Sequence, residues 1–313
     1  MEWAQREFKS YRCNPYLKRK LTSAIRSFQH WVRVWIRKMG GEKMGIRGLF
    51  LAFALIPLFW ESAGFAAEEE KVTGEAGLAV LSQYVSRGYE LSAHSIVFWP
   101  SLGIAYRGFS ISFWGNIDSD EHATQSFTPD NPGHKSFNET DLTLGYAYKI
   151  GKLELIGGYM YYSTKYAPDT QEVYISVSYD TIAKPTLVIY RDIDDLPGTY
   201  INLSFSQSWQ VYRQITFDLG AAVGYFWGDG DAWKTFESST GAYTGEKYRA
   251  FHDGMISTGI TVPIGKSWAI QPVAQYWFPL SSKASRTVNG TSYNPAGNID
   301  ETFVTGVNLT LSF

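Results

Sequence analysis

The last residues of the chain alternate between apolar and small or polar side chains. Phe303, Val307, Leu309, Leu311 and Phe313 fall on one face, whereas the opposite face carries mainly Thr, Gly, Asn and Ser. Successive side chains of a β-strand point to opposite sides, so a period of two indicates a strand with one apolar face. This pattern constrains the fold more than any other feature of the sequence.

The same period recurs upstream, and we find no amphipathic helix after Glu70. The pattern predicts an all-β fold of about twelve strands, most of them longer than the roughly 9–11 residues with which a tilted strand crosses a bilayer. The predicted strands are 75–87, 94–107, 109–118, 139–150, 153–163, 171–181, 185–193, 199–210, 213–227, 250–262, 267–278 and 301–313.

Short and long connections alternate along the chain. Tight turns are predicted near 107–108 and 151–152, whereas 119–138, 228–249 and 279–300 are long. This asymmetry is typical of a transmembrane antiparallel β-barrel in a Gram-negative outer membrane, with short turns and both termini in the periplasm. A final Phe313 resembles the last residue of such barrels, where it belongs to the signal for the barrel-assembly machinery.

A soluble β-sandwich or lipocalin-like barrel would alternate too, but it would present strongly polar residues to water. Here the polar faces are mostly small, as in a lumen wall. The chain has 11 Trp, 21 Tyr and 19 Phe, and several Tyr and Trp residues lie at predicted strand ends, as in interfacial aromatic girdles. Both observations favour the membrane barrel, whose lipid partners would be outer-membrane lipid and lipopolysaccharide.

The amino-terminal region is interpreted separately. Residues 44–67 have a short basic start, an apolar run from Gly48 to Trp60 and small residues before Glu68, which predicts a cleaved signal peptide. The apolar run is shorter than the roughly 20 residues of a membrane-spanning helix. We interpret 1–43 as an extension upstream of the true start at Met44, so that 68–313 forms the barrel.

Charge narrows the choice of partners. Residues 1–43 are basic, whereas 68–313 carry 16 basic and 26 acidic side chains. An acidic domain gives no reason to expect nucleic acid as a partner. The one cysteine, Cys13, lies in the extension, so no disulfide scaffold or cysteine-based zinc module is expected.

If the apolar faces contact lipid, a set of charged residues faces the lumen. The candidates are Arg87, Arg107, Asp118, Asp141, Glu154, Glu172 and Asp218. Acids outnumber bases, which favours cations over anions in a pore. The same charges can instead pair across the lumen and hold the barrel shut, and the sequence does not separate the two.

Three segments carry a resemblance to a known family. They are Ser82-Gln83-Tyr84-Val85-Ser86-Arg87-Gly88, Trp114-Gly115-Asn116-Ile117-Asp118 and Glu139-Thr140-Asp141-Leu142-Thr143-Leu144-Gly145-Tyr146. Their order resembles S-D-Y-V-x-R-G, W-x-S-N-V-D and E-x-D-L-x-x-G-Y of the uncharacterised proteobacterial outer-membrane family Gcw_chp, with departures at Gln83 and Gly115. The resemblance covers about the first half of the barrel region. It implies an outer-membrane barrel and no established activity.

Enzymatic chemistry is not expected, nor is a cofactor. Some twelve-stranded barrels are lipases with His and Ser close together, and the nearest match is His134-Lys135-Ser136 in a loop rich in Pro, Gly and Asn. Acidic turns at Asp229–Asp231 and Asp192–Asp195 could suggest Ca²⁺ but need no ion to explain them.

The sequence therefore favours a narrow channel for passive passage of small solutes with a weak cation preference. The alternative is a closed structural or adhesive barrel that acts through its outer loops.

Overall fold

The computed structural model describes residues 71–126, 132–165 and 167–313. The predicted extension 1–43 and signal peptide 44–67 lie outside the described residues. In the described part of the chain, no helix has both the length and the apolar character needed to cross a membrane.

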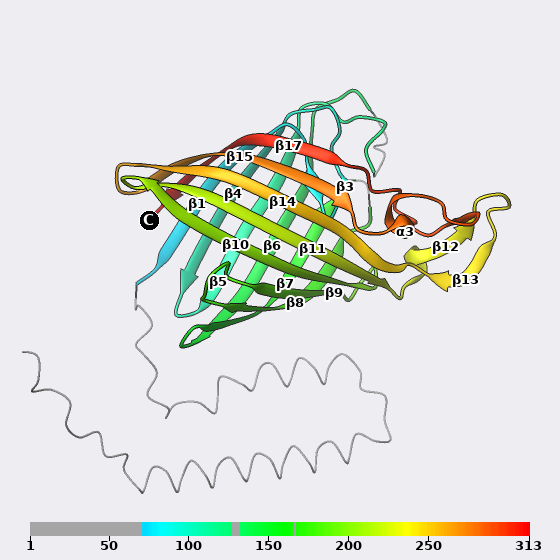
Figure 1. Cartoon of the computed structure of the whole chain (residues 1–313), viewed down its shortest axis with the longest axis horizontal. Coiled ribbons are helices and arrows are strands. Elements are labelled where there is room, and N and C mark those ends of the chain that lie inside the picture. The colour runs from blue at the N-terminus through cyan, green and yellow to red at the C-terminus, as the bar shows by residue number, and fades with distance from the viewer. Residues whose placement is uncertain (1–70, 127–131, 166) are drawn as a thin grey trace, which may run out of the picture. The chain divides into compact units, whose positions relative to one another are not determined.

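Twelve strands of the described chain form one closed antiparallel barrel (Figure 1). The last strand pairs with the first, from Glu75 opposite Ser312 to Leu81 opposite Gly306. In chain order the barrel strands are β1 (Thr73–Leu81), β4 (Val97–Tyr106), β5 (Phe109–Asp118), β6 (Ser136–Ile150), β7 (Leu153–Thr164), β8 (Thr170–Tyr179), β9 (Thr186–Asp192), β10 (Gly198–Tyr212), β11 (Ile215–Gly228), β14 (Arg249–Ile264), β15 (Trp268–Pro279) and β17 (Thr302–Ser312). The predicted fold class, an all-β barrel of about twelve strands, is confirmed.

The apolar face of the strands points outward. On β6 Leu142, Leu144 and Tyr146 are exposed, whereas Thr143 and Gly145 between them face the interior. The same holds on β17, where Phe303 is 63% exposed and its neighbour Val304 only 1%. The outward apolar residues form a belt around the barrel. Such a belt is unfavourable in water and is the surface that lipid chains solvate. The barrel is therefore a transmembrane barrel.

The two ends of the barrel differ in their connections. The tight turns β4–β5, β6–β7, β8–β9, β10–β11 and β14–β15 lie at one end, together with the start of β1 and the end of β17. Arg107 and Gly108, with φ angles of 48° and 82°, form one such two-residue turn, whose backbone matches the strand twist. Figure 1 shows the long loops at the other end, as the alternation of connection lengths predicts. We call this the loop end.

Two long connections meet in a small sheet at the loop end. The segment between β11 and β14 holds η2 (Asp231–Trp233), β12 (Lys234–Glu237) and β13 (Tyr243–Lys247). The segment between β15 and β17 holds α3 (Ser282–Ser285) and β16 (Thr291–Ser292), and β16 pairs with β12. The two predicted outer loops therefore form one joint structure.

The predicted strand 75–87 is wrong over its last residues. β1 ends at Leu81 and β4 begins only at Val97, so the chain leaves the barrel wall between them. It forms a separate hairpin of β2 (Val85–Ser86) and β3 (Tyr89–Glu90). Arg87 and Gly88 both have positive φ, 49° and 79°, which makes a turn where a strand was expected.

The outward face of β6 provides a test of the membrane assignment. An arginine at Leu144, near the middle of the strand, is expected to cost about 2–4 kcal/mol of folding free energy in a bilayer. An arginine at the neighbouring Thr143, which faces the lumen, is expected to cost clearly less. Urea unfolding in lipid vesicles measures both, and equal costs would contradict the assigned faces.

Candidate functional site

The β2–β3 hairpin is packed against the barrel interior at the loop end. Tyr84 contacts the rings of Trp99 and Trp114, with centroids 5.2 and 5.4 Å away. Tyr84 and Val85 belong to a buried cluster with Leu81 on β1, Val97 on β4 and Val304 on β17. Apolar residues therefore draw this segment inward, away from the wall.

Gly88 allows the hairpin turn to approach the opposite wall. A Cβ atom at this position would lie 2.8 Å from Cβ of Asp253 on β14 and 2.9 Å from Cδ1 of Ile299. No ordinary side chain fits in that space, and the positive φ of Gly88 also favours glycine. Its neighbour Arg87 is thereby placed at the far side of the barrel mouth.

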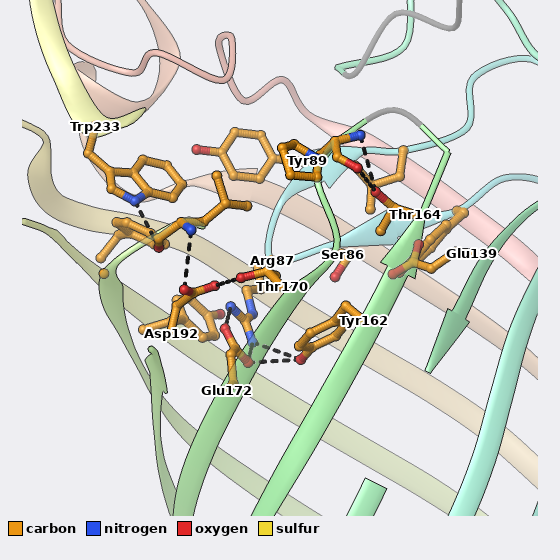
Figure 2. Close-up of a pocket in the computed structure, with 18 of the residues that line it drawn as sticks. Ser86, Arg87, Tyr89, Glu139, Tyr162, Thr164, Thr170, Glu172, Asp192 and Trp233 are labelled. Carbon is orange, nitrogen blue, oxygen red and sulfur yellow. Dashed lines mark hydrogen bonds and ion pairs between the residues drawn. The ribbon is translucent and has the colours of Figure 1, made fainter. Parts of the chain in front are cut away.

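Arg87 forms an ion pair with Glu172 on β8 (Figure 2). Its two terminal nitrogens donate to the two carboxylate oxygens, each at 2.7 Å. Tyr162 on β7 donates its hydroxyl to Oε2 of Glu172 at 2.8 Å and accepts from Arg87 at 3.3 Å. A bidentate arginine–carboxylate pair of this geometry is among the stronger polar contacts in proteins.

Two further walls of the Arg87 site are aromatic. The guanidinium carbon lies 4.8 Å from the ring centroids of both Tyr190 on β9 and Tyr200 on β10. Cation–π attraction is strongest where water is excluded. Burial by itself lowers the pKa of Arg87, but Glu172 and the surrounding tyrosines outweigh that effect, and the pKa lies well above its ordinary value. Arg87 therefore stays charged.

A cavity of about 160 Å³ adjoins this ion pair. Its walls come from the hairpin, from the loop-end parts of β6 to β11 and from η2. Many of the lining side chains are aromatic, including Tyr89, Phe226 and Trp233. Three carboxylates line it, Glu139, Glu172 and Asp192, whereas Arg87 is the single basic residue among the described residues that do so.

The hairpin is also held at its base. The Thr302 hydroxyl donates to the Glu90 carboxylate, and Tyr89 donates to Oδ1 of Asn294 at 2.6 Å. The backbone nitrogen of Ser126 donates to the carbonyl of Glu90 at 2.7 Å. Arg87 therefore lies at the tip of a segment whose ends are fixed.

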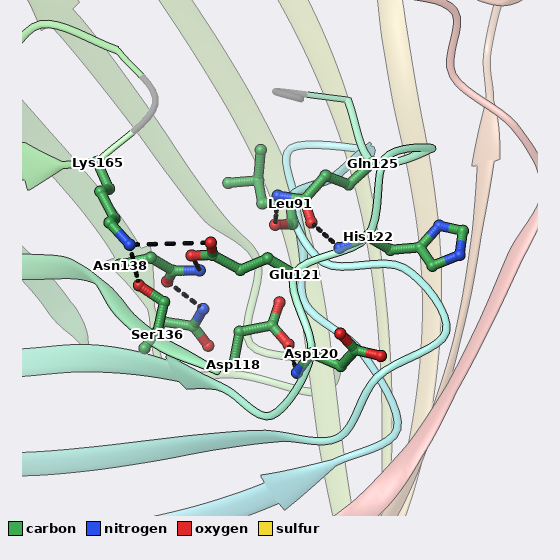
Figure 3. A network of polar contacts seen from close by, with 10 residues as sticks. Leu91, Asp118, Asp120, Glu121, His122, Gln125, Ser136, Asn138 and Lys165 are labelled. Atoms are coloured by element: carbon green, nitrogen blue, oxygen red, sulfur yellow. Dashed lines mark hydrogen bonds and ion pairs between the residues drawn. The ribbon is translucent and has the colours of Figure 1, made fainter. Parts of the chain in front are cut away.

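Asp118 has a different role from the one its inward position suggests. It lies at the end of β5 and is fully buried, where it accepts from Ser95 at 2.6 Å. It also accepts from the backbone nitrogen of Asp120 (Figure 3). Close by, Asn116 donates to Asn138, and Lys165 donates to Ser136 and lies 3.8 Å from Glu121. This network fixes the β5–β6 connection to the barrel.

The other predicted lumen residues lie at two levels. Asp141 on β6 is opposite Tyr162 and within electrostatic range of Arg87 and Glu172, so the structure brings Arg87, Asp141 and Glu172 together. Near the turn end, Glu154 accepts from Ser178 at 3.3 Å. Asp218 accepts there from Thr261 and Gln271 at 2.6 and 3.0 Å. Arg107 is exposed on the β4–β5 turn, with its guanidinium beside Tyr106.

The candidate catalytic pair and acidic turns have other partners. His134 is exposed, whereas Ser136 is buried and accepts from Lys165. Asp229 pairs with Arg191 at 2.5 Å, and Asp231 pairs with Lys234 at 2.8 Å. Among the described residues, no group of three or more His, Cys, Asp or Glu side chains is arranged to hold a metal ion.

Sequence reasoning missed the tyrosines and Glu139. Tyr162, Tyr190 and Tyr200 occupy inward positions on β7, β9 and β10, which are three of four consecutive strands. The alternation of the strands places these bulky aromatic residues on the inward face, and that signal is present in the sequence. Their convergence on Arg87 depends on strand register.

No protein-family model matches the chain, and no curated protein matches it. Among solved structures it is similar to the KdgM porin, with 10% identity over 77% of this chain and 99% of that chain and a TM-score of 0.43. An outer-membrane channel from Pseudomonas putida F1 has 8% identity over 80% and 100%, with a TM-score of 0.43. Outer-membrane phospholipase A from Escherichia coli has 12% identity over 76% and 89%, with a TM-score of 0.38.

The Arg87–Glu172 pair is expected to be the main polar tie between hairpin and wall. Replacing Glu172 by Gln leaves a mostly buried cation without its partner, which costs about 3–5 kcal/mol of folding free energy. The matched change Glu154→Gln, near the turn end, is expected to cost under about 1 kcal/mol. Urea unfolding measures both changes.

A double-mutant cycle separates the pair from its surroundings. Arg87→Ala combined with Glu172→Gln is expected to cost less than the sum of the two single changes, because no buried charge is then left unpaired. Additive costs would show that the two side chains do not stabilise each other.

Proposed function

We propose that the chain forms a narrow channel for passive passage of small solutes, with a weak cation preference, in the outer membrane of a Gram-negative cell. The observation that carries the proposal is the lining of the lumen between its two ends. Many of the inward positions there are small, among them Gly77, Ser101, Ser112, Thr143 and Ser257, whereas Trp114, Met160 and Tyr174 are bulkier. Small residues leave the centre of a twelve-stranded barrel free for water.

The charges of the lumen wall support the cation preference. Asp141, Glu154, Glu172 and Asp218 face inward from the strands, and Lys149 is an inward base among the described strands. A water-filled lumen with excess negative charge lowers the energy of cations and raises that of anions. Arg87 carries a positive charge at the loop end, but the charge of Glu172 neutralises that of Arg87.

Placement in the membrane follows from the same proposal. The turn end, with the start of β1 and the end of β17, lies in the periplasm, and the loop end faces outward. Phe313 is hydrogen-bonded through its backbone to Gly74 at the closing seam, which leaves its side chain, 55% exposed, for the barrel-assembly machinery during insertion. The apolar belt is solvated by outer-membrane lipid and lipopolysaccharide.

Selectivity in a planar bilayer tests the channel. The purified, refolded protein is expected to give stepwise currents whose reversal potential under a salt gradient has the sign of a cation-selective pore. Combined Asp141→Asn, Glu154→Gln and Asp218→Asn is expected to move that potential toward zero, since three inward charges are removed. Glu246→Gln on β13 is the control, because this exposed residue lies outside the lumen.

Two observations favour a second function. Arg87 and Glu172 bridge the hairpin and the wall, and the loops of β12 and β16 join in one outer sheet. Both features suit a closed barrel that acts through its outer loops. A correctly folded, heat-modifiable protein that carries no current would favour this function and would contradict the channel.

A further inference from the structure

The barrel wall contains the parts of a binding site for a guanidinium group. Glu172 offers both carboxylate oxygens to two guanidinium nitrogens, and the Tyr162 hydroxyl accepts a further N–H. The rings of Tyr190 and Tyr200 each lie 4.8 Å from the guanidinium carbon. A planar, forked cation between aromatic rings fits a guanidinium much better than the point charge of an ammonium group.

The group that fills this site belongs to another segment. The four residues of the wall lie on the consecutive strands β7, β8, β9 and β10. Arg87 reaches them from the turn of the β2–β3 hairpin, in which only two residue pairs are in register. A two-stranded hairpin of this size has little stability of its own. Its own pairing therefore gives the hairpin little rigidity, and contacts with the rest of the barrel, among them those of Arg87 and Gly88, hold it in place.

The adjoining cavity gives a solute access to the same site. Glu172 and Tyr162 line both the guanidinium site and the cavity, which also reaches loop residues such as Pro168 and Leu196. Glu139 and Asp192 place two further carboxyl groups in its lining. Carboxyl groups in a cavity wall offer hydrogen-bond acceptors to the N–H groups of an entering cation.

We propose that the wall site around Glu172 binds small solutes that carry a guanidinium group. Arg87 fills the site when no solute is present, and a bound solute displaces it and frees the hairpin tip. The proposal names the substrate class of the channel, so its transport consequence rests on the proposed function. The binding step itself does not require conduction.

The competition between solute and Arg87 sets the concentration range. A group tethered by a short segment acts at an effective concentration on the order of millimolar. A free guanidinium solute is therefore expected to compete at millimolar concentration in the wild-type protein. Removal of the arginine side chain is expected to make the empty site bind at lower concentration.

The binding site is tested with methylguanidinium in an Arg87→Ala variant. We expect methylguanidinium to bind this variant and raise its melting temperature. In Arg87→Ala combined with Glu172→Gln, binding is expected to weaken about tenfold or more, because a two-pronged charged contact is lost. Methylammonium, which has the charge without the planar fork, is the matched probe and is expected to bind more weakly than methylguanidinium. Equal affinity of both variants, or of both probes, would overturn the proposal.

The wild-type protein provides a second arm, which remains informative if Arg87→Ala does not fold. Millimolar methylguanidinium is expected to increase protease cleavage within the 82–96 segment, whereas equal methylammonium is not. If bilayer currents are observed, methylguanidinium on the loop side is expected to change them in the same concentration range. Unchanged cleavage at all concentrations would overturn the proposal. If methylguanidinium increases cleavage in a protein that carries no current, the proposed binding site stands and only the proposed channel is rejected.

Discussion

The fold depends on one constraint: backbone groups in an apolar solvent must hydrogen-bond to one another. A sheet inside a bilayer meets this constraint only when it closes, because an open edge leaves unpaired N–H and C=O groups in hydrocarbon. Here β17 pairs with β1, and backbone bonds between Gly74 and Phe313 complete the seam at the turn end. Closure also explains the alternation, since each strand must present one face to lipid and the other to the lumen.

A closed wall leaves the connections as the part of the chain free to vary. In this chain the β1–β4 connection folds inward, and Gly88 permits a contact with Asp253 that no larger residue would allow. The apolar contacts of Tyr84 and Val85 hold one side of that connection against the wall. The polar contacts of Arg87 hold the other side, through Glu172, which is 85 residues further along the chain. At the loop end, the β1–β4 connection thus supplies the arginine, and four neighbouring strands supply the side chains that contact it.

The sequence predicted the barrel because local information is sufficient for it. Leu142, Leu144 and Tyr146 alternate with small residues whatever their neighbours are, and the final strand does the same. Local information failed over 82–87, because Tyr84, Val85 and Ser86 have the same extended, alternating character in a hairpin inside the barrel as in its wall. Arg87 and Glu172 were both predicted to face the lumen. Their pairing, and the tyrosines around them, depend on the register of strands far apart in sequence.

In the channel that we propose, the hairpin tied to the wall by Arg87 narrows the lumen at the loop end. Single-channel conductance of the wild-type protein and of Arg87→Ala, each shown to be folded by heat modifiability, tests it most directly. We expect a measurable wild-type conductance and a larger one in the variant, because the hairpin tip is then released. Equal conductance in both proteins, or no current in either, would contradict it.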